Sequence, residues 1–280
     1  MIHNTICAVI VTYGQHYLHT VTYQSLLRVA TLLGYLKFHI IVYDNSPSKC
    51  DIKPNDIFAC FIYHHDASNT GVVSGYVYAI EYCIKNGINW LLRLDQDSCF
   101  DENLILDFLS VPNVNDYYAI CPKILCKGNI VSPSIVLKGG ILRPVKQTCF
   151  GVCDYRITFI NSMSFINIGE IDVVKKIQLL KSQLDLSDHE FALSLPRHKI
   201  YVMKINVNHN LSITDKSYVS TKRYSMILIN ESRLILQNEG LYGRIIFKTR
   251  LLVRLFKFVI KGRIDCAKLS FMAMLNIYDY

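Results

Sequence analysis

The first half of the chain alternates short apolar runs with amphipathic stretches. Four runs rich in β-branched and aromatic residues predict strands: Ile6–Thr12, Phe38–Tyr43, Phe58–Tyr63 and Asn89–Leu94. Between them, apolar residues recur at helical spacing over about 16–33 and 72–85. Near-continuous apolar strands separated by helices are typical of a parallel sheet covered on both faces. The pattern therefore predicts an α/β fold.

The second half is predicted to be less regular and to end in helices. The stretch 111–168 mixes short strands with turns, and one further strand is expected over Ile200–Ile205. Helical patterns follow in the stretches 169–181, 188–195 and 218–238. We divide the chain into a domain of residues 1–240 and a basic helical tail of residues 241–280.

Composition excludes several classes of protein. With 280 residues, 51% of them hydrophobic, the chain can bury a sizeable core, unlike a disordered or small disulfide-stapled protein. Ten cysteines occur without a paired C-x2-C zinc pattern, which fits a reducing cytoplasmic compartment. No apolar run reaches the roughly 18 residues of a spanning helix.

The candidate chemistry lies where the predicted strands end, because ligands of parallel α/β sheets bind beyond the carboxyl ends of the strands. Asp95 and Asp97 follow the fourth strand, and two such carboxylates can hold a divalent cation that neutralises a diphosphate. The alternative is an acidic turn in which Asp97 or Ser98 caps a helix over Phe100–Ser110.

Two earlier segments carry weaker signals. Asp44 closes the second strand and can accept hydrogen bonds from a nucleobase or ribose, although by itself an Asx turn before proline, which needs no ligand, is the favoured explanation. Asn69 and Gly71 open a helix whose free amides can meet a phosphate, but the G-x-G-x-x-G and P-loop patterns are missing. A glycine-containing helix start without a ligand is the alternative there.

Two later segments add a carboxylate and a histidine. Asp188 is expected in the first turn of a helix, where the macrodipole favours its ionised form and where it can take a proton from a hydroxyl. Ser187 and Glu190 have the spacing of a capping box. His209 follows the strand at 200–205, and a lone histidine is more often structural than a ligand.

The order of these motifs resembles the family-2 inverting glycosyltransferases. The matching elements, in order, are Val11-Thr-Tyr13, Asp44-Asn-Ser46, Asn69-x-Gly71 and Leu94-Asp-Gln-Asp-Ser98. The D-Q-D-S form is similar to their bacterial rhamnosyltransferase branch. The resemblance continues in Phe159-Ile-Asn-Ser162, Asp185-Leu-Ser-Asp188-His-Glu190, His209-Asn-Leu-Ser212 and Lys222-Arg-Tyr224 with Asn230.

The resemblance implies a GT-A fold, a mostly parallel Rossmann-like sheet flanked by helices, and assigns roles to matching residues. Those expected at the nucleotide are Thr12, Tyr13, Asp44, Asn69, Gly71 and Asp95. Those expected at Mg²⁺ or Mn²⁺ are Asp95, Asp97 and His209. Asp188 would be the catalytic base, and the acceptor side would include Asn161, Ser162, Arg223 and Tyr224. The chain departs from the family pattern at Val77, Met163, Ser212 and Ile229.

The net charge of +8 is concentrated in the tail. Residues 241–268 hold eight basic residues and one acid, interleaved with aliphatic and aromatic residues. The basic positions 250, 254, 257 and 261 lie on one helical face, with Leu252, Leu255, Phe256 and Val259 largely opposite. This pattern predicts an interfacial helix that meets anionic lipid headgroups; a core-packed helix with a solvated basic face is the alternative.

The resemblance implies transfer of a sugar with inversion from a nucleotide-sugar donor, dTDP-L-rhamnose, to a lipid-linked oligosaccharide. The expected setting is bacterial O-antigen or other surface-polysaccharide synthesis, in the cytoplasm at the inner face of the membrane. Galactofuranose, glucose or galactose are alternative sugars, and a non-catalytic nucleotide-sugar-binding or scaffold protein is a further alternative. A nucleic-acid-binding module is least favoured, because no helix-turn-helix, zinc or RNP signature is present.

Overall fold

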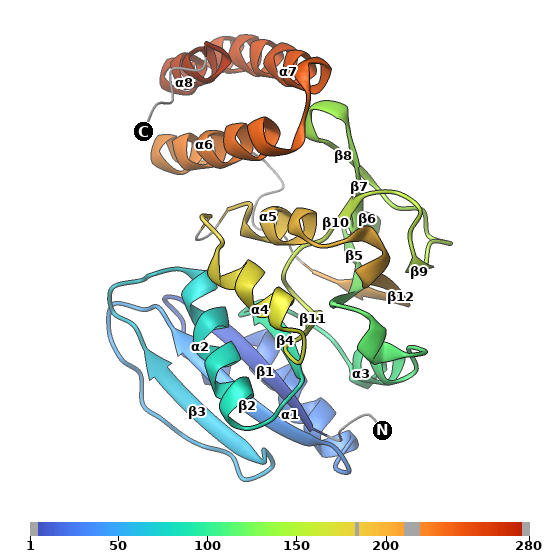
Figure 1. The fold of residues 1–280 in the computed structure, drawn as a ribbon. Coiled ribbons are helices and arrows are strands. Elements are labelled where there is room, and N and C mark those ends of the chain that lie inside the picture. The colour runs from blue at the N-terminus through green and yellow to red at the C-terminus, as the bar shows by residue number, and fades with distance from the viewer. Residues whose placement is uncertain (1–4, 183–184, 210–218, 276–280) are drawn as a thin grey trace. The chain divides into compact units, whose positions relative to one another are not determined.

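The computed structural model describes residues 5–182, 185–209 and 219–275 (Figure 1). The chain divides into two compact units. The first consists of Met1–Ser134 and Pro144–Asn210, and the second of Ile135–Arg143 and Leu211–Tyr280. The boundary expected after residue 240 falls inside the second unit, and a separate function for residues 241–280 stays a prediction.

The first unit is built on a mixed sheet with the strand order β3-β2-β1-β4-β11-β5-β12-β9, and β6 pairs with β5. These strands are β1 (Thr5–Thr12), β2 (Lys37–Asp44), β3 (Cys60–His65), β4 (Trp90–Asp95), β5 (Ala119–Cys126), β6 (Asn129–Ser132), β9 (Gly151–Val152), β11 (Ser164–Asn167) and β12 (Ile200–Asn208). The four strands predicted from the first half are parallel to one another. β11 runs antiparallel between β4 and β5.

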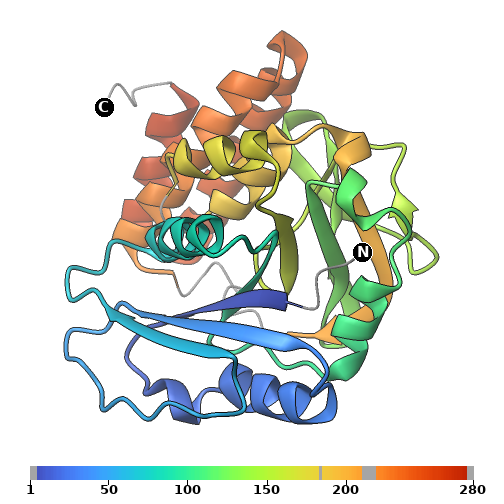
Figure 2. The same ribbon diagram turned by 60° about the horizontal axis from the view of Figure 1, so that its bottom comes forward.

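Helices cover both faces of this sheet, as the alternating pattern predicts. They are α1 (Val21–Leu32), α2 (Val72–Lys85), α3 (Glu102–Leu109), α4 (Ile171–Gln178) and α5 (Ser187–Ser194). α1 and α2 lie on opposite sides of the sheet (Figure 2). Ile6, Ala8 and Ile10 of β1 belong to one buried cluster with side chains of α1 and α3. The alternate residues of β1 face α2, because successive strand side chains point to opposite faces.

A glycine allows α2 to approach β1 closely. A Cβ atom at Gly75 would lie 2.9 Å from Cγ2 of Val11 and 3.1 Å from the ring of Tyr43. The first contact is shorter than real Cβ atoms show and the second is unusually tight, so a side chain at Gly75 would require the helix or its neighbours to shift. The N-terminus of α2 therefore stays close to the strand ends.

Some predicted boundaries were wrong for local reasons. The helix expected from residue 16 is a 3-10 turn, Tyr17–His19, followed by α1, because Thr20 caps α1 by accepting from the amide of Tyr23. The third strand runs over Cys60–His65 rather than Phe58–Tyr63. α3 is capped by Asp101, which accepts from the amide of Asn103, so neither Asp97 nor Ser98 is its cap.

The remaining short elements connect or follow these. In chain order they are η2 (Val114–Asp116), β7 (Ser134–Leu137), η3 (Lys138–Gly140), β8 (Ile141–Pro144), β10 (Ile157–Thr158) and η4 (Arg197–Lys199). All of them except η4 lie within 111–168, where the sequence predicts a mixture of short strands and turns.

The second unit contains the C-terminal helices that the sequence predicts: α6 (Thr221–Asn238), α7 (Leu241–Ile260) and α8 (Ile264–Met274). α7 and α8 pack side by side, and the hydroxyl groups of Tyr224 and Ser270 lie 2.9 Å apart between α6 and α8. Gly262, with a φ of 69°, makes the turn between α7 and α8. Among the described residues, none of the helices is both long enough and apolar enough to cross a membrane.

Candidate active site

Three strand ends meet at one edge of the sheet, as the predicted topology requires. Thr12 of β1 is in register with Asp44 of β2, and Val11 is in register with Asp95 of β4. Because these strands are parallel, their polar ends lie side by side. Residues far apart in the sequence are thereby brought to one place.

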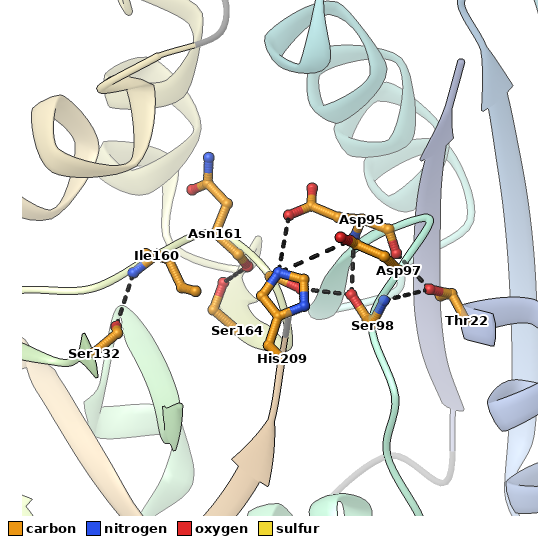
Figure 3. A network of polar contacts seen from close by, with 10 residues as sticks. Thr22, Asp95, Asp97, Ser98, Ser132, Ile160, Asn161, Ser164 and His209 are labelled. Atoms are coloured by element: carbon orange, nitrogen blue, oxygen red, sulfur yellow. Dashed lines mark hydrogen bonds and ion pairs between the residues drawn. The ribbon is translucent and has the colours of Figure 1, made fainter. Parts of the chain in front are cut away.

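Asp95, Asp97 and His209 form a cluster at this edge (Figure 3). Their ligand atoms all lie within 4.8 Å of one another. Nε2 of His209 is 3.9 Å from Oδ2 of Asp95 and 3.9 Å from Oδ1 of Asp97, too far for a hydrogen bond. Two carboxylates and an imidazole that converge at this spacing fit one divalent cation with ligand bonds of about 2.1 Å.

Hydroxyl groups of Thr22 and Ser98 hold the turn that carries Asp97 (Figure 3). Thr22 of α1 donates to the carbonyl of Asp95 at 2.5 Å and accepts from the amide of Ser98 at 2.8 Å. The Ser98 hydroxyl accepts from the amide of Asp95 and lies 2.5 Å from the hydroxyl of Ser162. With these bonds the turn presents both carboxylates in a fixed orientation.

His209 reaches the site directly after the end of β12. Its amide donates to the carbonyl of Leu125, and it forms an isolated antiparallel bridge with Ser98. The residue is 4% exposed, and its Nδ1 has no hydrogen-bond partner among the described residues. Nε2 is thus directed at the two carboxylates by the backbone on both sides of the cluster.

The surroundings of Asp95 disfavour its ionised form when no cation is bound. The pKa of Asp95 is raised to about 6, chiefly by the desolvation of its half-exposed side chain and also because Asp97 and Asp188 are negative. His209 and Arg93 act in the opposite direction. A cation at this position would relieve the repulsion between the carboxylates.

Asp188 lies in the first turn of α5, as predicted. The predicted capping box was wrong. Ser187 is the first residue of the helix rather than its cap, and Leu186, with a φ of 70°, occupies the cap position. Glu190 instead accepts from the amides of Lys181 and Ser182, so it holds the chain before the helix.

Asp44 is more deeply buried than its predicted role at a nucleotide suggests. It is 2% exposed and accepts from Tyr63 at 2.5 Å, from the amide of Ser46 at 2.9 Å and from the Thr12 hydroxyl at 3.3 Å. Burial alone would raise the pKa of Asp44, but these hydrogen bonds hold it below its ordinary value. The bond to Ser46 is the Asx turn that the sequence left open.

Three other residues expected at the nucleotide surround this edge. Tyr13 is 54% exposed, and its amide donates to the side chain of Gln96, beside the aspartates. Asn69 and Gly71 have φ values of 51° and 94° and precede α2. α2 follows β3, which is parallel to β2, so the helix begins at the carboxyl ends of the strands, and no side chain caps its first turn.

The segment expected on the acceptor side lies next to the cluster. Ser162 is buried against Ser98, and Asn161 donates to the hydroxyl of Ser187 at 3.4 Å. Met163 has a φ of 61°, a conformation that favours glycine, which is the residue usual in the family at this point. Methionine in place of that glycine therefore strains the backbone at residue 163.

The other predicted positions belong to the second unit or lie outside the described residues. Arg223 and Tyr224 are in α6, where Tyr224 is buried and contacts Ser270. Ile229 is in the same helix. Ser212 lies outside the described residues. A role for Arg223 and Tyr224 at an acceptor stays a prediction.

Sequence reasoning missed Arg93, two residues before Asp95 on β4. Its guanidinium is fully buried between the rings of Tyr76 and Phe191, at 5.3 and 4.8 Å from their centroids. Burial lowers the pKa of Arg93 to about 10, so it stays protonated at neutral pH. A charged residue in the apolar run Trp90–Leu94 was the available signal, because a buried cation needs nearby anions.

The comparisons with known proteins rest on structure. The sequence matches no family model and no curated protein. Among solved structures, S. aureus TarS 1-349 in complex with UDP-GlcNAc has a TM-score of 0.55 and 14% identity over 91% of this chain and 73% of that one. The complex of the same fragment with UDP has a TM-score of 0.53 and 11% identity over 99% and 93%.

A second neighbour is GalNAc-T7 with UDP, GalNAc and Mn²⁺, which has a TM-score of 0.50 and 13% identity over 82% of this chain and 47% of that one. Both neighbours share the sheet and its flanking helices. This chain has the GT-A fold. At this level of identity, the likeness establishes the GT-A fold and no more. The residues Asp95, Asp97 and His209 occupy the strand-end edge of that fold.

Proposed function

We propose that the chain is a glycosyltransferase that moves a sugar from a nucleotide-activated donor to a hydroxyl acceptor. The observation that carries the proposal is the convergence of Asp95, Asp97 and His209 at the strand ends of a GT-A sheet. The neighbours of the same fold were solved with UDP-GlcNAc, and with UDP, GalNAc and Mn²⁺. These ligands support a nucleotide sugar and a divalent metal for this chain.

Asp95, Asp97 and His209 would hold Mg²⁺ or Mn²⁺. A bound cation supplies positive charge that stabilises the departing diphosphate. The chain's own part is to hold three ligand atoms together, with Thr22 and Ser98 fixing the turn beneath them. Without a cation, the negative charges of the site repel one another, and this repulsion contributes to the raised pKa of Asp95.

Asp188 is the proposed base, in keeping with the family resemblance. Transfer with inversion is a single displacement, so one carboxylate that accepts the proton of the acceptor hydroxyl is sufficient. Asp188 lies in the first turn of α5. Its charge contributes to the raised pKa of Asp95, so the two carboxylates share one electrostatic environment.

The remaining donor contacts are assigned to the strand-end edge. Tyr13 presents an exposed ring, and the amides of α2 after Asn69 and Gly71 can meet a phosphate. Thr12 and Asp44 are buried, so we assign them to shaping the pocket wall through the turn at Ser46.

The specific donor is proposed as dTDP-L-rhamnose, on the strength of the Asp95-Gln-Asp97-Ser98 motif. The uridine nucleotides of the structural neighbours favour a UDP-sugar as the competing donor, with galactose, glucose or galactofuranose as the sugar. The proposed acceptor is a lipid-linked oligosaccharide of O-antigen or another surface polysaccharide, used at the inner face of the bacterial cytoplasmic membrane.

A thermal-shift panel tests the proposal. The purified chain is heated with dTDP- and UDP-sugars, each with Mn²⁺ and with EDTA. The proposal expects one donor to raise the melting temperature in the presence of Mn²⁺ only. If no nucleotide or nucleotide sugar stabilises the chain with either addition, the non-catalytic scaffold is favoured instead.

A further inference from the structure

One side of α7 is exposed and almost wholly apolar. The residues that share this side recur at steps of three or four and fall within about 120° of the helix circumference. They are Leu241, Tyr242, Ile245, Thr249, Leu252, Val253, Phe256, Val259 and Ile260. Phe256 is 58% exposed and Ile260 is 85% exposed. Thr249 is the one polar member of this set, which we name the α7 outer face.

Basic residues border the α7 outer face on both sides. Helical spacing places Arg244 and Lys248 along one border and Lys257 and Lys261 along the other. The Arg244 guanidinium also donates to two backbone carbonyls at the C-terminal end of α6, so part of its hydrogen-bonding capacity is used within the second unit. α7 contains no acidic residue. The apolar strip therefore lies between two rows of positive charge.

The α7 outer face contains Leu252, Phe256 and Val259, which the sequence pattern placed on the apolar side, but two of the predicted basic residues lie elsewhere. Arg250 and Arg254, expected to meet lipid headgroups, instead turn toward α6 and bond to Glu231. Arg254 donates to both carboxylate oxygens, at 2.5 and 2.8 Å, and Arg250 donates at 3.3 Å. Arg250 also donates to the carbonyl of Gly139. Because they bond to Glu231, Arg250 and Arg254 are unsuited to headgroups, whereas Lys257 and Lys261 of the predicted basic face are exposed.

The opposite side of α7 packs against the other helices of the second unit, so the outer face is the side left exposed. Phe247, Leu251 and Phe258 are buried, and the Phe258 ring meets that of Tyr224 edge to face at 4.9 Å. α8 continues the exposed pattern with Ile264, Lys268 and Phe271, at steps of four and three. The second unit thus exposes apolar side chains on two consecutive helices, with one lysine, Lys268, and one acid, Asp265, beside those of α8.

We propose that the α7 outer face docks on an anionic lipid surface, with the helix lying in the plane of the membrane interface. An apolar strip between cationic borders suits the acyl boundary and the headgroups of such a surface. A second copy of the chain is a poorer occupant, because pairing two such faces would bring basic borders together. The inference does not require the proposed sugar transfer, although a lipid-linked acceptor would make it useful.

Flotation with vesicles tests the proposal on the full chain, without donor or metal. Phosphatidylcholine vesicles are compared with vesicles that contain phosphatidylglycerol, at low and high salt. We expect binding to the anionic vesicles only, weakened by salt. The double variant Val253→Ser/Phe256→Ser should bind at least about tenfold more weakly. Lys257→Gln/Lys261→Gln should lose about as much, since each cation near the surface contributes about fivefold.

Matched variants separate this surface from general effects. Leu32→Ser removes an exposed apolar residue of α1, and Lys37→Gln/Lys85→Gln removes two exposed cations of the first unit; both should bind like the unaltered chain. Unchanged flotation of the α7 variants would overturn the proposal. So would a dimer, seen by light scattering, that Val253→Ser/Phe256→Ser dissociates. Either result leaves nucleotide-sugar binding, and hence the proposed function, untouched.

Discussion

Arg93 and Ser164 are joined by two hydrogen bonds in the interior of the first unit. Nε and Nη2 of Arg93 donate to the Ser164 hydroxyl at 3.1 and 2.8 Å. The hydroxyl in turn donates to the carbonyl of Asn161. The same guanidinium lies over the ring of Phe191, in the helix that carries Asp188. This pair therefore connects β4, which ends in Asp95, with β11 and α5.

Removing the Ser164 hydroxyl should destabilise the fold markedly. Ser164→Ala leaves a buried cation without its acceptor, which should lower the free energy of unfolding by about 1.5–3 kcal/mol. Urea denaturation measures this. Thr31→Ala, on the exposed side of α1, should change it by less than about 0.5 kcal/mol. An effect at Ser164 no larger than that at Thr31 would refute the structural role of the pair.

Asp97 should be required for binding of Mn²⁺ alone. Asp97→Asn removes one of the converging ligands and should weaken Mn²⁺ binding at least about tenfold, as measured by calorimetry. Asp101→Asn alters a nearby aspartate that caps α3 and does not face the cluster, so it should bind Mn²⁺ normally. Equal affinities for the two variants would place the metal elsewhere.

Asp188 should be required for transfer but not for donor binding. Asp188→Asn cannot accept the proton, so kcat should fall by about 10²–10⁴ while the donor dissociation constant stays unchanged. Asp172→Asn, in the first turn of α4, is the matched control and should retain full turnover. Near-normal turnover by Asp188→Asn would remove Asp188 from the role of base.

Asp95 should make the metal-free protein less stable as the pH rises. Its folded pKa of about 6 exceeds the unfolded value of about 3.9, so ionisation opposes folding. The penalty is complete above pH 6 and disappears as the pH falls from 6 to about 4. Asp95→Asn should therefore melt higher than the unaltered chain at pH 7.5 in EDTA. The two melting temperatures should converge near pH 4, and a constant difference would contradict this account.

Most of the architecture could be predicted from the sequence because it depends on local patterns. Apolar runs and their polar ends predicted the first four strands and the meeting of Asp95 with the neighbouring strand ends. The assignment of His209 to the metal came from the family resemblance alone. Its position beside Ser98 depends on pairing between residues more than 100 positions apart. No local rule encodes such a contact.

The misjudged features were decided by tertiary contacts. Arg250 and Arg254 follow helical spacing on a basic face, yet Glu231 on another helix draws them inward. Glu190 has capping-box spacing, but the amides of Lys181 and Ser182 take its carboxylate. In both cases the side chain bonds to a group outside its own helix, and the spacing of residues within one helix cannot predict such a contact.

The central claim is that Asp95, Asp97 and His209 bind a nucleotide diphosphate through a divalent cation. Calorimetric titration of the full chain with UDP and with dTDP, first in Mn²⁺ and then after EDTA, tests it most directly. The account predicts that at least one nucleotide binds in Mn²⁺, that EDTA abolishes this binding, and that Asp97→Asn does not bind it under either condition. Binding that is equal with Mn²⁺ and EDTA, or that survives in Asp97→Asn, would contradict the account.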